Sequence, residues 1–573
     1  MAPALWEPGS SVENRAIGGV YPTVRPIAHR PPGFPRVDSR LGRIGGGALT
    51  IHAATRVGAD TAYAALARQL ASRLAGLARP GPEGPTWVGD EVDRVRVDPN
   101  DWSSPPPLTT GPLDDSLLSG RAGVAYVLAV CADLPGATSA WADLARATAY
   151  AALAGVERDL DSGRVVSVGL ADGAFGSARA ASLVADRIGD PMLAGAADQL
   201  TARLVALVAE SGPGTRWPDL LGGVAGVLLG VAHTPTTTPM RARAVEAMIA
   251  ALADTAEVDA SGAASWRMAG SDHAVVGAAH GGRGIAWALA DAAAVLRGDG
   301  EAAPSSRARR PAPAGTPTAG APRHADGRSA DASRMSAGPD ALRMSAGPDA
   351  ARARAFDAGR SGAPSAPDRV GVTSAPDRLG APSAADRAAE LARAATAWEA
   401  ARYDPESRAW PDLRVAAHVP AAMWCHGALG VGAIALRHWA TAPEMSAERD
   451  DAYRDIARAV AGVRHAIPPD AAPFDATLCH GLSGAIELHL IAARTWPSAR
   501  ADHLNRARAL AGRILAAGTE GRPGWTCGVR GGRNPNVLVG IAGVALTLAR
   551  CHDPDIAASA ALLTIDHPVG ERA

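Results

Sequence analysis

Apolar residues recur along most of this chain with the spacing of one face of an α-helix. The helical period is clearest over residues 61–79, 191–211, 240–254, 451–466 and 503–517. Strand-like alternation of apolar and polar residues is rare. We therefore expect an all-α protein in which each helix buries one apolar face against its neighbours.

A second pattern, Gly-x-x-Gly followed by an apolar run, divides the helical chain into repeats. It occurs seven times, and all but one of the intervals are about 50–60 residues long. Each repeat has room for two helices. The absent side chains of the glycines fit a helix N-terminus where two backbones approach closely. The first glycines of the seven turns are Gly120, Gly173, Gly223, Gly281, Gly427, Gly481 and Gly540.

Seven such helix pairs predict a closed ring. Each pair can bury its apolar face only against its neighbours, so the pairs stack and the two ends of the stack can meet. The expected fold is an α/α toroid with seven inner and seven outer helices. The inner helices would begin at the glycine turns, around a central cavity. The alternative is an open α-solenoid that binds a partner.

The one long interval between turns contains a segment of biased composition, residues 299–388. It is rich in Pro, Ala, Gly, Ser, Asp and Arg and contains the sequence RMSAGPDA twice. Such a segment cannot bury enough apolar surface to offset its ordering entropy, so we predict a disordered insert. The toroid would then comprise residues 60–298 and 389–565, after a poorly ordered extension over residues 1–59.

Composition and charge narrow the possible functions. The net charge is −1, and no basic stripe suggests binding to nucleic acid or to a membrane surface. The chain contains no lysine, which excludes a P-loop lysine, a kinase ATP lysine and a Schiff-base lysine. Its five cysteines do not suggest a disulfide framework. Neither a signal peptide nor a membrane-spanning run is evident, so we expect a cytoplasmic protein without a transmembrane segment.

Three of the glycine turns carry residues of the types that bind metals. They read Ala-His-Gly at His280, Trp-Cys-His-Gly at Cys425 and His426, and Cys-His-Gly at Cys479 and His480. In a closed ring the equivalent positions of successive repeats lie side by side, so the two cysteines should be neighbours. Two thiolates and one imidazole suit zinc and leave its fourth position open for catalysis. Cys425, Cys479 and His480 are the candidate ligands, and His426 is the alternative histidine.

The other three cysteines lack this pattern. Cys131 and Cys551 lie within apolar helical stretches, where we expect them to be ordinary core residues. Cys527 lies in a loop before the seventh turn and could face the cavity. We assign it no function.

The ordered set of turns resembles the lanthionine synthetase C family over about residues 114–555. The Trp-Cys-His-Gly form is similar to the cyclase domains of class II lanthipeptide synthetases, although the chain has no room for their dehydratase region. The resemblance implies a stand-alone cyclase with one zinc ion per chain, held by Cys425, Cys479 and His480. It also implies a dehydrated precursor peptide as substrate and a separate dehydratase as a candidate partner.

The reaction implied by this resemblance adds peptide cysteine thiols to dehydroalanine or dehydrobutyrine and forms thioether rings. His280 matches the family histidine proposed for acid/base work, and Asp219 matches a catalytic aspartate that would orient or activate a histidine. Asp219 also has an ordinary explanation as a helix N-cap or first-turn acid. His426, which stands where some stand-alone members have tyrosine, is the third candidate catalytic residue.

One position departs from the family pattern. Ala421 stands where some stand-alone members carry an arginine suited to stabilising an enolate. Arg414 or Arg283 would have to replace it through space.

Three other functions are compatible with parts of the pattern. A relative could couple glutathione to dehydroamino acids, and an inactive relative could serve as a peptide-binding scaffold. The intact ligand set and His280 argue against the scaffold. A prenyltransferase β-subunit is also a zinc toroid, but its ligands include an aspartate and it lacks paired Cys-His-Gly turns.

Overall fold

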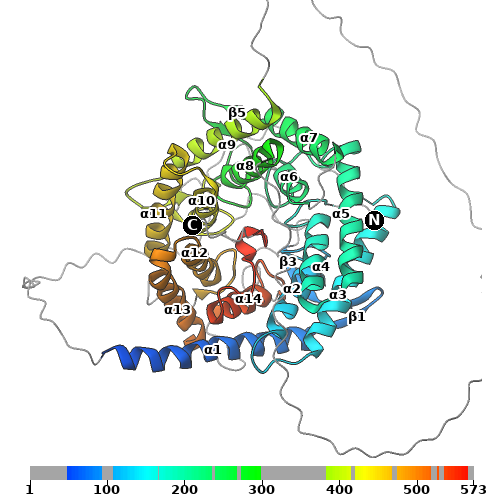
Figure 1. Ribbon diagram of the computed structural model, residues 1–573, viewed down its shortest axis with the longest axis vertical. Coiled ribbons are helices and arrows are strands. Elements are labelled where there is room, and N and C mark those ends of the chain that lie inside the picture. The colour runs from blue at the N-terminus through cyan, green and yellow to red at the C-terminus, as the bar shows by residue number, and fades with distance from the viewer. Residues whose placement is uncertain are drawn as a thin grey trace, which may run out of the picture. The chain divides into compact units, whose positions relative to one another are not determined.

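The computed structural model describes residues 48–92, 108–164, 167–234, 239–267, 273–298, 382–414, 420–467, 474–517, 525–527 and 534–565. These residues are mainly helical, and their helices form two concentric rings (Figure 1). The predicted α/α toroid is therefore confirmed.

The inner ring contains seven helices within the described residues. Each contacts the next inner helix, and the last contacts the first, so the ring closes. These helices are buried almost all round; every residue of α6, for example, is buried. The inner helices are α2 (Arg121–Ala132), α4 (Ala174–Ile188), α6 (Val224–Ala232), α8 (Gly282–Arg297), α10 (Ala428–Thr441), α12 (Leu482–Thr495) and α14 (Ile541–His552).

The outer ring covers the inner one, pair by pair. Each inner helix from α2 to α12 packs against the outer helix that follows it in sequence, whereas the last inner helix packs against the first outer one. This last pairing joins the first and the last helix of the described chain (Figure 1). The outer helices are α1 (Ala48–Leu77), α3 (Ala140–Asp161), α5 (Pro191–Ser211), α7 (Pro239–Thr255), α9 (Ala384–Ala400), α11 (Ala447–Ala466) and α13 (Arg500–Ala517).

The first glycine of each Gly-x-x-Gly turn is the N-cap of an inner helix, as the sequence predicted. Backbone hydrogen bonds connect every turn to the next. They complete a circle, because Leu118 of the first turn accepts from Val537 and Leu538 of the seventh. Gly427 shows why glycine is needed here. Its φ is 117°, and a Cβ at this position would lie 2.1 Å from the carbonyl oxygen of Ala421.

Short strands form in the connections between helices. Within the described residues they make five two-stranded sheets, of which the β9–β10 pair is parallel and the others are antiparallel. The strands are β1 (Arg79–Gly81), β2 (Gly84–Thr86), β3 (Val88–Val92), β4 (Leu108–Pro112), β5 (Glu257–Val258), β6 (Ala264–Ser265), β7 (Trp410–Pro411), β8 (Pro420–Ala421), β9 (Phe474–Asp475) and β10 (Trp525–Thr526).

The segment after α14 lies near the axis of the ring (Figure 1). It includes the short 3₁₀ helix Ala560–Leu562, and its backbone carbonyls accept hydrogen bonds from side chains of three inner helices and of the fifth turn. One of these donors is the indole of Trp424, whose Nε1 lies 2.9 Å from the oxygen of Ala561. The segment therefore ties the fifth turn to the centre of the ring.

Two predicted boundaries differ from the observed helix ends. The first outer helix begins at Ala48, inside the predicted extension, and α9 begins at Ala384, inside the predicted insert. Ser383 caps α9 by accepting a hydrogen bond from the backbone N of Asp386, which explains its start. The rest of the extension and of the insert, residues 1–47 and 299–381, lies outside the described residues.

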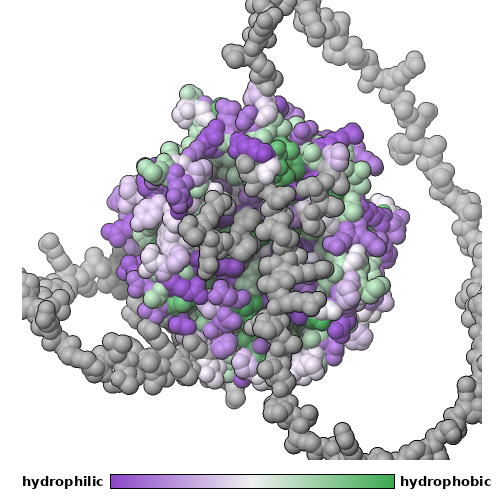
Figure 2. All heavy atoms as spheres, viewed as in Figure 1, coloured by the Kyte–Doolittle hydropathy of each residue, from purple (hydrophilic) through white to green (hydrophobic). Residues whose placement is uncertain are grey.

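One described helix, α5, is long and apolar enough to cross a membrane by length and composition alone. It packs against the outer helices α3 and α7 and the inner helix α4. The absence of a transmembrane segment stays a prediction. Figure 2 shows hydrophilic side chains over most of the visible rim, with hydrophobic residues in small groups.

Candidate metal and catalytic site

The fifth and sixth turns bring Cys425, Cys479 and His480 together. The backbone N of Trp424 donates to the oxygen of Cys479 at 2.7 Å, which places the two cysteine-bearing turns side by side. Potential ligand atoms of the three residues all lie within 4.8 Å of one another. Ring closure therefore produces the juxtaposition that the repeat phase predicted. Within the described residues, no fourth Cys, His, Asp or Glu joins this group.

The electrostatics of the group favour one thiolate. A hydrogen bond from the Cys479 thiol lowers the pKa of Cys425 well below its ordinary value; burial opposes this shift, and His480 adds to it. Burial raises the pKa of Cys479 in turn. Both cysteines are buried, whereas His480 is exposed, so the group opens to solvent on one side.

This donor set fits a zinc ion. Thiolate sulfur and imidazole nitrogen are the ligands that zinc prefers, and three protein ligands leave one position open. The backbone of His480 is also fixed in place, because its N donates to Oγ1 of Thr477, 3.2 Å away. The backbone N of Thr477 donates to Asp475 at 2.7 Å, so the strand β9 anchors this ligand.

His280, in the fourth turn, is paired with Asp219 in the third. Its Nδ1 lies 2.7 Å from Oδ2 of Asp219. The other carboxylate oxygen, Oδ1, accepts from the backbone N of Gly222 at 3.0 Å. Asp219 is neither the N-cap of α6, which is Gly223, nor part of its first turn, so that explanation is wrong. Its carboxylate instead bridges Gly222 and His280, and its catalytic role stays a prediction. With Nδ1 engaged, Nε2 is the ring atom of His280 that remains for a substrate.

His426 connects the His280–Asp219 pair to the metal group, because it stacks on His280 and directly follows Cys425. Its ring stacks on that of His280, with 5.3 Å between centroids and 24° between planes. The side chain is buried, and this burial lowers its pKa to about 4, so the ring is neutral at pH 7. Its Nδ1 lacks a hydrogen-bond partner. The metal group contains His480 and not His426, so geometry separates the two histidines that spacing left equivalent.

The structure also separates the two arginines considered as replacements at Ala421. Arg283 is fully buried and pairs with Asp455, NH2 to Oδ2, at 2.5 Å. It cannot reach a substrate, so this candidate is wrong. Arg414 is partly exposed and paired with Asp412 at 2.7 Å. Its positive charge contributes to lowering the pKa of His426, which places it near the site.

The remaining cysteines are not members of this cluster. Cys131 and Cys551 are buried in α2 and α14, as expected for core residues. Cys527 is half-buried beside β10, and burial raises the pKa of its thiol to about 11, so it is a poor nucleophile at neutral pH.

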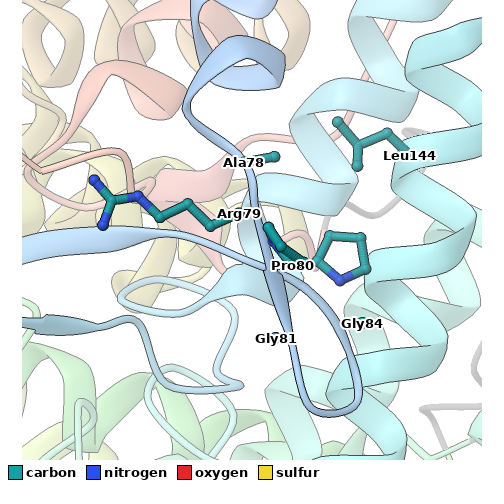
Figure 3. Close-up of a pocket in the computed structure, with 7 residues that line it drawn as sticks. Ala78, Arg79, Pro80, Gly81, Gly84 and Leu144 are labelled. Carbon is teal, nitrogen blue, oxygen red and sulfur yellow. The ribbon is translucent and has the colours of Figure 1, made fainter.

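Figure 3 shows a pocket outside this cluster, of about 330 Å³. It lies between the β1–β2 hairpin and α3, and its open, mostly apolar lining includes none of the predicted site residues. Arg79 extends away from Leu144 in this view (Figure 3). The pocket therefore offers no chemistry comparable to that of the glycine turns.

A family model described as "Lanthionine synthetase C-like protein" matches residues 111–302 and 379–564. The chain belongs to this family. Among solved structures, it is similar to "Nisin cyclase", with a TM-score of 0.42 and 14% sequence identity over 76% of this chain and 88% of that chain. Among curated proteins, none matches the chain. Family membership rests on the family model alone.

Proposed function

We propose that this lanthionine synthetase C-like protein is a zinc-dependent cyclase. It would add cysteine thiols of a dehydrated precursor peptide to dehydroalanine or dehydrobutyrine residues and so form thioether rings. The observation that carries the proposal is the convergence of Cys425, Cys479 and His480 beside the His280–Asp219 pair. Family membership supports the same reaction class.

Cys425, Cys479 and His480 would hold the zinc ion, because their donor types and proximity fit it. When bound, zinc supplies a positive charge that lowers the pKa of a coordinated substrate thiol. The protein residues must then position the acceptor and control protons. The neutral ring of His426, stacked on His280, keeps that imidazole in place and excludes water from one of its faces.

The bond changes assign a defined role to His280. As the substrate sulfur bonds to the β-carbon, the carbon–carbon π electrons move onto the α-carbon and its carbonyl. The α-carbon then needs one proton, which Nε2 of His280 supplies while Asp219 holds Nδ1. The thiol has released one proton, which restores His280 for the next cycle. Peptide mass is therefore unchanged.

The test is to incubate the protein and zinc with a dehydrated, cysteine-containing peptide and then to add a thiol-alkylating reagent. Cyclisation consumes thiols without changing the mass, so the product should resist alkylation. A parallel reaction with added glutathione separates ring formation from coupling to an external thiol. Thiols that remain fully alkylated after incubation with the wild-type protein and zinc would refute the proposed activity.

Matched variants connect the activity to the site. Cys425→Ala should lose most of the zinc, measured by metal analysis, whereas Cys131→Ala removes a buried core thiol and should retain it. His280→Ala should keep the zinc but slow cyclisation about 100- to 10,000-fold, the usual contribution of a general acid or base. Wild-type rates in His280→Ala would contradict its assigned role.

A further inference from the structure

Asp172 occupies the same place in the second turn as the histidines occupy in the fourth, fifth and sixth. Each of these residues directly precedes the first glycine of its turn. Because the turns are equivalent, this position faces the same end of the ring throughout. The backbone N of Asp172 donates to the oxygen of Leu221 at 3.3 Å, which fixes it against the third turn, the turn that carries Asp219.

The carboxyl group of Asp172 is incompletely satisfied within the protein. Ser119, the equivalent residue of the first turn, donates hydrogen bonds to it from its side chain and backbone. Its Oδ1, however, is buried and has no hydrogen-bond partner. Buried polar atoms are nearly always paired, so an unpaired one calls for an explanation such as a catalytic role or a bound water or ion.

The environment of Asp172 favours its neutral form. The pKa of the carboxyl is raised to about 7, mainly by burial and also by the nearby charge of Asp114, while the hydrogen bonds from Ser119 and the charge of His280 oppose this shift. A neutral carboxylic acid can donate a hydrogen bond, whereas a carboxylate can only accept one. Below about pH 7, Asp172 is therefore a donor.

The third turn lies between the turns that carry Asp172 and His280, and backbone hydrogen bonds join it to both. There the equivalent position is Gly222, and a Cβ added to it would meet no atom within 4 Å. The next glycine along the chain, Gly223, is in contrast tightly enclosed, with a backbone oxygen 2.4 Å from an added Cβ. Gly222 therefore leaves open space beside the turns of Asp172 and His280.

We propose that Asp172 binds the acceptor residue of the substrate peptide, donating a hydrogen bond to the carbonyl oxygen of the dehydroamino acid. This inference rests on the proposed cyclase function. As the C–S bond forms, negative charge develops on that oxygen, and a fixed donor stabilises it. Asp172 keeps its proton throughout, since the proton that reaches the α-carbon comes from His280. Ser119 is a positioning residue, because it orients the carboxyl group.

The test compares Asp172→Ala and Asp172→Asn with the wild-type protein, using the alkylation assay from pH 5.5 to pH 9. Asp172→Ala should lower kcat/KM about 100-fold or more at pH 6, as expected for the loss of one oxyanion donor. Asp172→Asn keeps an N–H donor that does not titrate. Its activity relative to wild type should therefore rise above about pH 7, where the wild-type carboxyl loses its proton.

Stability measurements distinguish this role from a structural one. Asp172→Asn keeps an oxygen that can accept from Ser119, so it should retain the wild-type Tm and zinc content. Asp172→Ala loses the hydrogen bonds from Ser119, so it should lower Tm while retaining the zinc. A matched control, Asp143→Asn, changes an acid on the outer helix α3 and should alter neither activity nor its pH profile. Rates of Asp172→Ala within twofold of wild type at pH 6, the same pH profile in Asp172→Asn as in wild type, or a failure of Asp172→Ala to fold would each overturn the proposal.

A binding measurement keeps this inference separate from the cyclase function. The probe is a dehydrated peptide in which serine replaces cysteine, so it cannot cyclise. Asp172→Ala should weaken its binding several-fold at pH 6. If the wild-type protein binds this peptide but never cyclises the cysteine form, the proposed function fails. If Asp172→Ala binds as tightly as wild type, the assignment of Asp172 fails.

Discussion

Gly277, at the place in the fourth turn that Asp219 has in the third, controls how closely the fourth turn packs against the fifth, which carries Cys425. Its φ is 113°, a conformation that residues with side chains rarely adopt. A Cβ at this position would lie 2.4 Å from the carbonyl oxygen of Cys425 and 2.6 Å from Cα of His426. Both atoms belong to backbone, so a rotamer change cannot relieve the clash, and the fifth turn itself must move.

The cost of Gly277→Ala can be worked out from these two effects. Placing a side chain in a positive-φ conformation costs about 1–2 kcal/mol. Overpacking against backbone costs about 1–3 kcal/mol more. We therefore expect the free energy of unfolding to fall by about 2–5 kcal/mol. Zinc affinity should also fall, because the displaced backbone carries Cys425.

Urea unfolding with and without zinc measures both consequences, since a ligand that binds only the folded state adds to its stability. Gly222→Ala is the matched control. It adds the same methyl group at a neighbouring glycine turn, but in open space, and should change stability by less than about 0.5 kcal/mol. If Gly277→Ala unfolds at the same urea concentration as Gly222→Ala, close packing between these turns does not hold the metal site.

Three further changes test other parts of the ring. Arg283→Met should destabilise the fold by about 3–5 kcal/mol in urea unfolding, since it leaves the buried carboxylate of Asp455 without this partner; adding Asp455→Leu should recover much of that loss. Burial lowers the pKa of His489 to about 3, so the folded state resists its protonation. The free energy of unfolding therefore keeps the full contribution of neutral His489 above about pH 6.5 and loses it as the pH falls. In urea titrations at pH 7.5 and pH 5, His489→Gln should make this loss of stability smaller. Replacing residues 306–381 with a short linker should leave helicity and zinc content unchanged by circular dichroism and metal analysis, whereas also removing the Ser383 cap of α9 should cost about 0.5–2 kcal/mol.

The fold was predictable because one local signal recurs at a constant phase. A glycine that starts an inner helix is visible as Gly-x-x-Gly, and seven copies require neighbours on both sides. Helix ends were less predictable. The start of α1 at Ala48 and that of α9 at Ala384 lie in segments whose overall composition is that of a linker. Composition averages over many residues, so it hides a local cap such as Ser383.

Arginine contacts show where sequence reasoning fails. Arg283 and Arg414 were equivalent candidates for the same role, since nothing local distinguishes one guanidinium from another. Their difference lies in distant partners: Asp455, on the outer helix α11, buries the first, and Asp412 holds the second at the β7–β8 hairpin. A long side chain can reach several directions from one backbone position, so its contact depends on packing that no motif encodes.

Asp172, in contrast to these arginines, has a short side chain and could have been found in the sequence. In a ring of equivalent turns, position within the turn determines which way a short side chain faces, whatever its type. Reading only for metal ligands selects His280, His426 and His480 and passes over an aspartate at the same position. Reading every turn at that position also selects Asp172, together with Ser119. Position within the turn is thus the more general guide to this end of the ring, because the backbone hydrogen bonds that close the ring place the turns whatever their side chains are.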